Sequence, residues 1–441
     1  MADKPENILA AIEVGSSKIV CALAEPIDKD HFKLIGFSEA ESAGMKAGDI
    51  IDMGKLTDQL RLVAKEVTKT TPGHPNIDLV TSGVAGEFVR SENTNSMIVS
   101  RHEVFTQGDV NRLIAEVKQI SLPPTMRYLD VYPQEYVIDK VTKTRSPVGL
   151  AGSRLEAKLH VVQVRTTVCK NLKRALQKSG MTLDIGHLAF NPVAAAEAIL
   201  TPEEKGLGVL MIDIGAELTS VCLYSENAVR YSRIYMHGGN SLTNEISIQT
   251  KLSKMESEKL KQDIGMVDFR PNEDVDQMRD LPEYSGLRNT PRTISTASLS
   301  AIMDEVVEDI FQQIYRDLKN ERIHSLIGNG VVLTGGSSWL PGIDRKAQEI
   351  FSRHLVGRDL SVRMGYPFVL NENMMFCTPG SLTMAEVTKD RAYISKPEYS
   401  TIFGYLNAQN QRFWAKPESQ EKTGFFSATF GAIKKIFVGN F

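Results

Sequence analysis

Two stretches that lie far apart in the chain carry an acidic residue two positions before a glycine. They are Ile8–Val20 (ILAAIEVGSSKIV) and Val209–Val221 (VLMIDIGAELTSV). In each, an apolar run ends in the acid, one further residue and the glycine, and β-rich sequence follows, which predicts a strand, a tight turn and a second strand. Glu13 and Asp213 therefore occupy equivalent places in two predicted hairpins.

The chemistry that suits such a turn is the binding of nucleotide phosphates. Glycine lets the backbone approach a ligand closely, and successive turn N–H groups form a cradle for anions. Mg²⁺ needs only one or two carboxylates beside the phosphates, and we predict that Glu13 and Asp213 hold it through water. The predicted phosphate-binding residues are Gly15, Ser16, Ser17, Lys18, Gly215, Ala216 and Glu217. Either turn by itself also fits an ordinary hairpin, where an acid and a glycine are common.

A third stretch, Gly330–Gly342 (GVVLTGGSSWLPG), predicts a buried strand that runs into a double glycine. At Gly335, Gly336 and Ser337 a flat group such as adenosine can lie against bare backbone. The alternative is a plain turn after a strand. The sequence contains neither a G-x-x-x-x-G-K-[ST] loop nor a G-x-G-x-x-G motif, so the two commonest nucleotide folds are not supported.

The ordered set of two phosphate hairpins and an LTGGSS turn resembles the superfamily of actin, sugar kinases and heat-shock chaperone ATPases. Within it, the chain resembles the FtsA family of actin-like bacterial cell-division proteins from about Glu6 to Lys396. The stretches that carry this resemblance are GVAGEF (Gly83–Phe88), YLDVYPQEYVIDK (Tyr128–Lys140), SPVGLAGSRLEAKLHVV (Ser146–Val162) and NPVAAAEAILTPEEKGLGVLMIDIG (Asn191–Gly215).

The resemblance implies an α/β, actin-like two-domain ATPase fold, in which duplicated mixed-sheet domains enclose a nucleotide cleft that takes ATP and Mg²⁺. It also implies that Gly238 and Gly239 support the phosphates, and that Glu258 and Lys261 reach the ribose and base from one helix face. The alternative for this last pair is a surface ion pair at i,i+3 spacing. Relatives usually have glycines where this chain has Ala216 and Glu217, which predicts ATP binding with at most slow ATPase activity. Catalytic residues are not identified.

The resemblance and the local patterns together predict a division of the chain into domains. A helical period at Asp109–Val117 and alternating strands at Tyr128–Val141 and Leu155–Val164 support an inserted α/β body, and an amphipathic helix begins at Ser298. The predicted segments are 1–81, 163–204 and 378–395 for the first large domain, 82–162 for the FtsA-type insertion, 205–242 and 297–377 for the second large domain, 243–296 for its own insertion, 396–424 for a flexible polar linker and 425–441 for a terminal helix.

The terminal segment Phe425–Phe441 predicts an amphipathic helix that lies in the plane of a membrane surface. On a helical wheel its apolar side chains share one face, with Lys435 opposite and Lys434 at the flank. Seventeen residues at 1.5 Å each rise only about 25 Å, so lying flat is favoured over spanning. The predicted membrane-binding residues are Phe426, Phe430, Ile433, Lys434, Lys435, Ile436, Phe437 and Phe441. The alternative is a helix docked on the protein's own core.

Composition and cysteine spacing argue against several other classes of protein. A net charge of -3 gives no overall basic field, so nucleic acid is not expected as a partner. Cys21, Cys169, Cys222 and Cys377 lack the spacing of zinc ligands, and neither a secretory signal nor a spanning helix is expected.

The resemblance implies a cell-division protein of the cytoplasmic membrane face at the division site. It implies self-association into filaments that anchor FtsZ to membrane lipids at the septum, alongside other division proteins. The FtsZ C-terminal tail is expected to bind the 243–296 insertion, with Arg288 and Arg292 as candidate contacts because guanidinium groups suit carboxylates. The alternatives are a sugar-type kinase of the same superfamily, which needs a positioned general base, and a chaperone-like ATPase.

Overall fold

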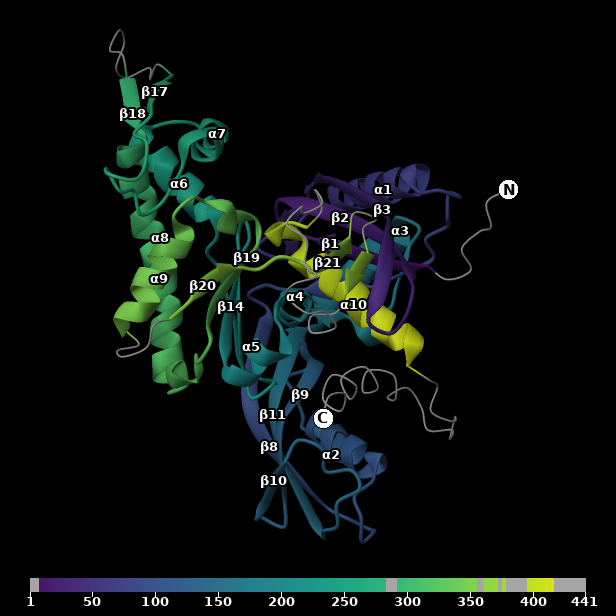
Figure 1. Cartoon of the computed structure of the whole chain (residues 1–441). Coiled ribbons are helices and arrows are strands. Elements are labelled where there is room, and N and C mark those ends of the chain that lie inside the picture. Colours follow the sequence, from purple (N-terminus) through teal and green to yellow (C-terminus); the bar gives the residue numbers. More distant parts are fainter. Residues whose placement is uncertain (1–7, 283–291, 355–359, 372–374, 378–394, 416–441) are drawn as a thin grey trace.

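The computed structural model describes residues 8–282, 292–354, 360–371, 375–377 and 395–415. Figure 1 shows a first large domain around β1–β3, a second large domain around β14 and β19, and a smaller body around β8–β11. Each large domain contains a five-stranded sheet, in the order β1-β2-β3-β22-β21 in the first and β16-β15-β14-β19-β20 in the second.

The first domain begins with an antiparallel meander, and successive side chains along its strands point alternately to two faces of the sheet. Its elements are β1 (Leu9–Val14), β2 (Lys18–Pro26), β3 (His31–Glu41), β4 (Met45–Lys46), β5 (Asp49–Ile50), α1 (Met53–Thr70), β6 (Leu79–Val80), β7 (Gly83–Val84), α3 (Thr166–Lys178), β12 (Thr182–Leu183), η1 (Ile185–His187), β13 (Ala189–Phe190), α4 (Asn191–Ile199), β21 (Val369–Asn371), β22 (Met375–Cys377), η5 (Pro397–Tyr399) and α10 (Ser400–Trp414). Ile12 packs against α1 and α3, and its neighbour Ala11 packs against α4 and α10. Because both faces are covered, β1 and β2 are apolar along most of their length, whereas β3 also carries exposed polar residues.

The second domain repeats this plan and adds a parallel strand beside its first hairpin. Its elements are α5 (Pro202–Leu207), β14 (Val209–Ile214), β15 (Thr219–Ser225), β16 (Ala228–Tyr235), α6 (Gly239–Thr250), α7 (Lys254–Ile264), β17 (Met278–Leu281), β18 (Arg292–Ser295), α8 (Thr296–Asn320), η2 (His324–Leu326), β19 (Gly330–Thr334), η3 (Gly336–Trp339), α9 (Ile343–His354) and β20 (Val362–Met364). Met211 faces the same core as Ala11 of the first sheet, while Ile212 faces α8 and α9. The two sheets therefore share one central core that contains α4 and α10.

The strands β21 and β22 correct the predicted domain division. The sequence placed 297–377 in the second domain, but β22 pairs antiparallel with β3 of the first sheet. A strand pattern shows that a strand will form, whereas its partner is chosen by contacts that are distant in sequence.

The smaller body is a four-stranded antiparallel sheet, in the order β10-β9-β11-β8, with one helix on it. Its elements are β8 (Val89–Val99), α2 (Gln107–Gln119), β9 (Met126–Ile138), β10 (Thr142–Thr144) and β11 (Arg154–Arg165). The helix and the two long strands form where their periodicities predict them. The body touches the second domain through a buried histidine: His160 Nε2 lies 2.7 Å from Ser232 Oγ of β16, and its Nδ1 lies 2.7 Å from Asn93 Oδ1 of β8. Burial lowers the pKa of His160 to about 4, so the ring is neutral there.

The segment that follows Lys396 also differs from the prediction. It was expected to be a flexible linker, but residues 397–414 form η5 and the helix α10, which packs against α4 and β1. One of the polar side chains that predict a linker is bonded inside the fold. Asn410 donates to the backbone oxygens of Asp28 and His31, at 2.8 and 3.2 Å. Burial and hydrogen bonding of polar groups depend on tertiary partners that composition does not show.

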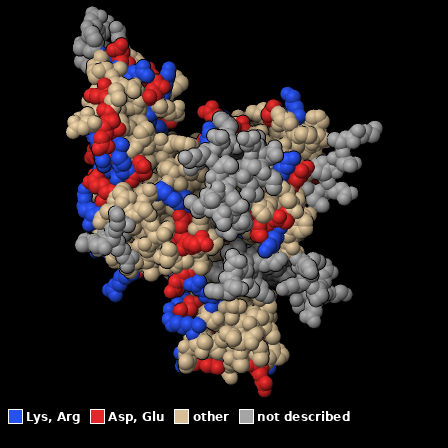
Figure 2. All heavy atoms as spheres, in the orientation of Figure 1, with Lys and Arg blue, Asp and Glu red and all other residues tan. Residues whose placement is uncertain are grey.

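In the part of the chain that the structure describes, no helix has the length and apolar character needed to cross a bilayer. The predicted membrane-binding residues Phe426, Phe430, Ile433, Lys434, Lys435, Ile436, Phe437 and Phe441, together with Arg288, lie outside the described residues. Figure 2 shows charges of both signs interspersed along the outer helices of the second domain, and a mostly uncharged face of the smaller body around α2.

Candidate functional site

The two predicted hairpins form with the same geometry. In β1–β2 and in β14–β15 the acid lies one strand pair before the turn, and four residues separate the last paired positions. The N–H of Gly15 donates across its turn at 3.0 Å, and the N–H of Gly215 does so at 2.9 Å. A Cβ at Gly15 would lie 2.8 Å from a backbone oxygen of its own turn, so this turn requires a residue without a side chain.

The hairpins face each other across a cleft of about 1230 Å³ between the large domains. Every residue predicted to bind nucleotide or metal lines this cleft, with the exception of Gly238. A Cβ at Gly238 would meet the backbone oxygen of Gly215 at 2.6 Å, so this glycine packs against the second hairpin and supports its shape. The structure thus brings together three turns that are separated by more than half of the chain.

The two acids lie in the cleft wall, where the pKa values of both carboxyl groups are raised. Burial, and in second place the charge of Asp213, raises the pKa of Glu13 to about 8, while Lys18 acts in the opposite direction. Burial raises the pKa of Asp213 to about 6. Within the described part of the chain, Glu13 Oε2 is buried and has no hydrogen-bond partner. A bound cation is the kind of neighbour that would favour the ionised form of both carboxylates.

The third turn closes the cleft from the second domain. Gly335 has φ 87°, and a Cβ there would lie 2.3 Å from Asp213 Oδ1, so only glycine fits. Gly336 differs, because a Cβ at this position has a single neighbour, at 3.9 Å, and would face open space. The hydroxyl of Ser337 donates to the backbone oxygen of Gly215 at 3.0 Å, which ties this turn to the second hairpin.

The helix α7 brings its predicted pair to the start of α6. A capping box between Ser253 and Glu256 starts the helix, as the sequence pattern favours. Lys261 is buried and donates to Glu258 Oε2 at 2.7 Å, to the backbone oxygen of Gly239 at 3.1 Å and to Thr243 Oγ1 at 2.9 Å. This is an inward-facing network and not a solvated surface pair. Thr243, which sequence reasoning missed, lies one helical turn after Gly239.

Glu217 points across the cleft to the first domain. Its Oε2 accepts a hydrogen bond from the backbone N–H of Ala47, in the turn between β4 and β5. Ala47 has φ 50°, a conformation that side chains rarely adopt. The carboxylate that was expected beside the phosphates is therefore bound to a first-domain hairpin.

A second contact at the cleft joins the predicted residue Lys18 to Trp339 and Glu398, which sequence reasoning missed. Lys18 Nζ lies 3.3 Å from Glu398 Oε1, and the indole N–H of Trp339 donates to Glu398 Oε2 at 2.5 Å. Trp339 lies within the Gly330–Gly342 stretch, but Glu398 follows Lys396, in the segment for which polar composition predicts a flexible linker. All three side chains line the cleft.

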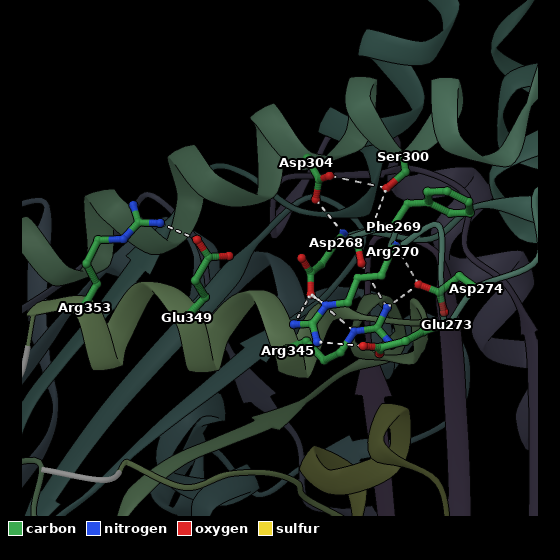
Figure 3. Close-up of polar contacts among 10 residues, drawn as sticks. All are labelled: Asp268, Phe269, Arg270, Glu273, Asp274, Ser300, Asp304, Arg345, Glu349 and Arg353. Atoms are coloured by element: carbon green, nitrogen blue, oxygen red, sulfur yellow. Dashed lines mark hydrogen bonds and ion pairs between the residues drawn. The ribbon is translucent and has the colours of Figure 1, made fainter.

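An ion-pair network holds the loop that follows α7. Figure 3 shows side chains of α8 and α9 converging on the loop that follows α7. Arg345 of α9 bonds Asp268 Oδ2 at 3.3 Å, the Asp268 backbone oxygen at 3.0 Å and Asp274 Oδ2 at 2.8 Å. Asp304 of α8 accepts from the Asp268 backbone N–H at 2.8 Å, and Arg270 pairs with Asp268 at 2.9 Å. The loop is thus fixed to two helices, which fixes the angle at which α7 faces the cleft.

Arg292, the described member of the predicted partner-binding pair, lies at the start of β18. Its guanidinium donates to the backbone oxygens of Pro282, at 3.2 Å, and of Thr250. These bonds attach the β17–β18 hairpin to the end of α6, so this side chain has a structural role in the insertion.

Comparisons with known proteins agree with this architecture. A family model described as "SHS2 domain inserted in FTSA" matches residues 86–163, and one described as "Cell division protein FtsA" matches residues 210–404. A model of the type IV pilus assembly protein PilM matches residues 139–269.

Curated relatives extend the match over nearly the whole chain. The cell division protein FtsA of Neisseria meningitidis serogroup B is 29% identical over 409 residues, covering 92% of this chain and 91% of that protein. FtsA of Escherichia coli K12 is 25% identical over 415 residues, covering 91% and 90%. Among solved structures, a PilM–PilN type IV pilus biogenesis complex has a TM-score of 0.62 at 16% identity, covering 91% of this chain and 98% of that one, which shows a shared fold.

The fold is actin-like, as the sequence predicted: two α/β domains of similar build face each other across a cleft, and an SHS2-type body is inserted into the first. The two FtsA models match separate parts of the chain, and the relatives span nine-tenths of it. The chain belongs to the FtsA family of cell-division proteins.

Proposed function

We propose that the cleft binds ATP together with Mg²⁺. The observation that carries this proposal is the convergence of two equal acid-turn hairpins and the Gly335–Ser337 turn on one cleft. Its volume of about 1230 Å³ is ample for a nucleotide. The turn N–H groups and Lys18 suit phosphates, and the exposed backbone at Gly336 suits adenosine.

The two acids fit a magnesium ion that keeps most of its waters. No cluster of three or more metal-binding side chains occurs among the described residues, so Glu13 and Asp213 would hold the ion together with phosphate oxygens. When bound, it would neutralise phosphate charge. On the opposite wall, Lys261 and Glu258 would position the ribose and base, and their mutual hydrogen bond keeps both side chains ordered.

The decisive test is Gly336→Asp. Because a Cβ at this position meets only one atom, at 3.9 Å, the fold should tolerate the substitution, while the carboxylate would enter the adenosine site. Calorimetry should show that ATP affinity falls at least about a hundredfold, since charge and bulk both oppose the ligand. Gly336→Ala is the matched control and should bind more tightly than the Asp variant. Unchanged ATP binding by Gly336→Asp would show that the site is elsewhere.

In the cell, an actin-like role in division follows from family membership. We propose in addition that the chain polymerises, binds the FtsZ C-terminal tail and attaches to the cytoplasmic face of the membrane through residues 425–441. Lipid-vesicle sedimentation with and without ATP, comparing the full chain with one lacking its last 17 residues, tests filament, ligand and anchor together. A short anchor binds weakly alone, and neighbouring copies on a filament would multiply the attachment.

The smaller body supports the self-association proposal. Met97 and Val99 on the edge strand β8, and Ile120 after α2, are 50%, 66% and 56% exposed. Exposed apolar groups on an edge strand favour pairing with another chain. Val99→Lys should reduce ATP-dependent pelleting, and Val141→Lys, which changes an 81% exposed residue near the β9–β10 turn, is the matched control. Equal pelleting by all three proteins would remove β8 from the contact.

We propose that the FtsZ tail binds the 243–296 insertion, with Arg288 and Arg292 as candidate contacts. Replacing both by Glu should weaken a tail peptide by reversing the charge that attracts its carboxylates. Because Arg292 also holds the β17–β18 hairpin, Arg292→Lys is needed as a control that keeps the charge. A peptide that binds the double Glu variant as tightly as the original would reject both contacts.

The kinase alternative has a direct assay. Phosphate transfer from ATP to a panel of sugars should be undetectable, and free phosphate release should be slow. Brisk transfer to any sugar would favour a kinase over a division protein.

A further inference from the structure

Glu398 is a carboxylate that stands inside the proposed nucleotide cleft and uses both of its oxygens. Oε1 pairs with Lys18 Nζ at 3.3 Å, and Oε2 accepts the indole N–H of Trp339 at 2.5 Å. Lys18 belongs to β2 of the first domain, Trp339 to η3 of the second, and Glu398 to η5, which precedes α10. One side chain therefore links three elements around the cleft.

The surroundings of Lys18 are anionic and crowded. Its Nζ lies 3.6 Å from Glu39 Oε2 and 3.8 Å from the centre of the Tyr399 ring, and the Tyr399 hydroxyl donates to Glu39 Oε2 at 2.8 Å. The Glu398 side chain is only 18% exposed. The ion pair is consequently better shielded from water and salt than an ordinary surface pair.

A polyphosphate in this cleft would compete with Glu398 for the same cation. Lys18 follows the first phosphate turn directly, and its ammonium group is the cleft's cation on that hairpin. A carboxylate and a phosphate repel each other, and the one ammonium cannot neutralise both fully. Binding of phosphates therefore favours exchange of the Lys18 partner from Glu398 to the ligand.

We infer that Glu398 is a built-in competitor of the nucleotide phosphates, which holds Lys18 and Trp339 in the ligand-free chain and is displaced when a polyphosphate binds. This inference rests on the proposed nucleotide site and adds its regulation. The displacement concerns the Glu398 side chain and leaves the backbone of η5 in place. The backbone oxygen of Pro397 accepts from Gly335 N–H at 3.3 Å and from Thr334 Oγ1 at 3.0 Å, and the Tyr399 hydroxyl keeps its bond to Glu39. What is released are the contacts of Glu398 with Lys18 and Trp339.

The first experiment measures affinity by calorimetry for ATP, ADP, adenosine and inorganic tripolyphosphate. Glu398→Gln should raise the affinity for the three phosphate-bearing ligands about threefold to tenfold, in the range of a partly shielded ion pair, and leave adenosine unchanged. Glu398→Ala, which removes the acceptor as well as the charge, should change affinity in the same direction. Circular dichroism establishes that both variants are folded.

The matched control is Glu41→Gln. Glu41 lies in the same cleft wall, is exposed and stands opposite Lys18 in the β2–β3 register, but the ion pairs of Lys18 in the described residues are with Glu39 and Glu398, so this variant removes an equal charge without removing an ion-pair partner. Its effect should be smaller. The effect of Glu398→Gln should also disappear in a Lys18→Met background, because the competition acts through Lys18.

Trp339 supplies an optical readout. The chain has two tryptophans, and Trp414→Phe leaves Trp339 as the single reporter. Tripolyphosphate should change its fluorescence, and Glu398→Gln without ligand should already show part of that change, because the indole N–H has lost its carboxylate partner.

The outcomes separate the two proposals. If the unmodified chain binds no ATP, the proposed function fails and the competition fails with it. If ATP binds, three results would show that the nucleotide site stands and the competitor role is wrong. They are an ATP affinity of Glu398→Gln that is lower than or equal to that of the unmodified chain, an effect of Glu398→Gln no larger than that of Glu41→Gln, and an effect that persists in the Lys18→Met background.

Discussion

Replacing Glu13 by glutamine should stabilise the ligand-free chain near neutral pH while weakening its response to a magnesium nucleotide. The reason is the raised pKa of Glu13, about 8 against an ordinary 4.5, which burial and the Asp213 charge produce. The folded chain therefore holds this proton more tightly than the unfolded chain does. Stability from this group is complete below about pH 4.5 and is lost as the pH rises towards about 8.

The size of the effect follows from the shift. Between about pH 5 and about pH 7.5 the difference in proton binding lowers the stability of the folded chain by roughly 2 to 3 kcal/mol, the upper value applying if the whole shift is realised. Glutamine carries no charge to bury, so the variant should lack this loss. The gain of Glu13→Gln over the parent should thus be small at low pH and large at pH 7.5.

Urea unfolding at both pH values measures the difference, and Glu41→Gln is the control for removal of an exposed cleft carboxylate. With ATP and Mg²⁺ present the order should reverse, because a cation favours the ionised Glu13 that the variant lacks. A gain that is equal at both pH values would show that Glu13 is not protonated in the folded chain. An undiminished response of the variant to Mg²⁺ would remove Glu13 from the metal site.

Three further predictions test other parts of the molecule. Glu217→Ala should speed hydrogen exchange of the Ala47 amide about tenfold by removing its acceptor, whereas Glu217→Gln should preserve most of the protection; equal exchange in all three proteins would deny the cross-cleft bond. The pKa of His160 is lowered from 6.5 to about 4, so the free energy of unfolding should fall by roughly 2 to 3 kcal/mol as the pH drops from about 7 to about 4.5. Acid unfolding curves of His160→Gln should lack this loss of stability. Phe430→Glu with Phe437→Glu should release the protein from anionic vesicles while ATP binding is retained, and a variant that still floats with vesicles would place the anchor elsewhere.

Local sequence determined the parts of the site whose geometry is set within a few residues. An apolar run followed by acid, x and glycine predicts a strand and a turn wherever it occurs, and both copies fold alike around Glu13 and Asp213. The same holds for the helical period that follows Ser298, which becomes α8. Period and turn chemistry depend on neighbours in sequence, so they can be recognised before the fold is known.

Tertiary structure decided which groups meet across the cleft. Glu217 bonds Ala47, and Glu398 bonds Lys18, through contacts between residues that are 170 and 380 positions apart. No spacing rule covers such pairs, because the direction of a long side chain depends on which partner the folded domains place within reach.

The segment after Lys396 shows the same division most clearly. Its polar residues predict a linker, yet α10 is buried between the two sheets, because Ile402, Phe403 and Leu406 pack in the central core and the Asn410 amide and the Tyr405 hydroxyl find hydrogen-bond partners on the first domain. The sequence alone determined that two acid-turn hairpins, a strand that ends in a double glycine and an actin-like plan exist in this chain. Only the tertiary structure decided that α10 belongs to the core and that Glu398 enters the cleft, since the burial of a polar group is favourable only where its partners are already in place.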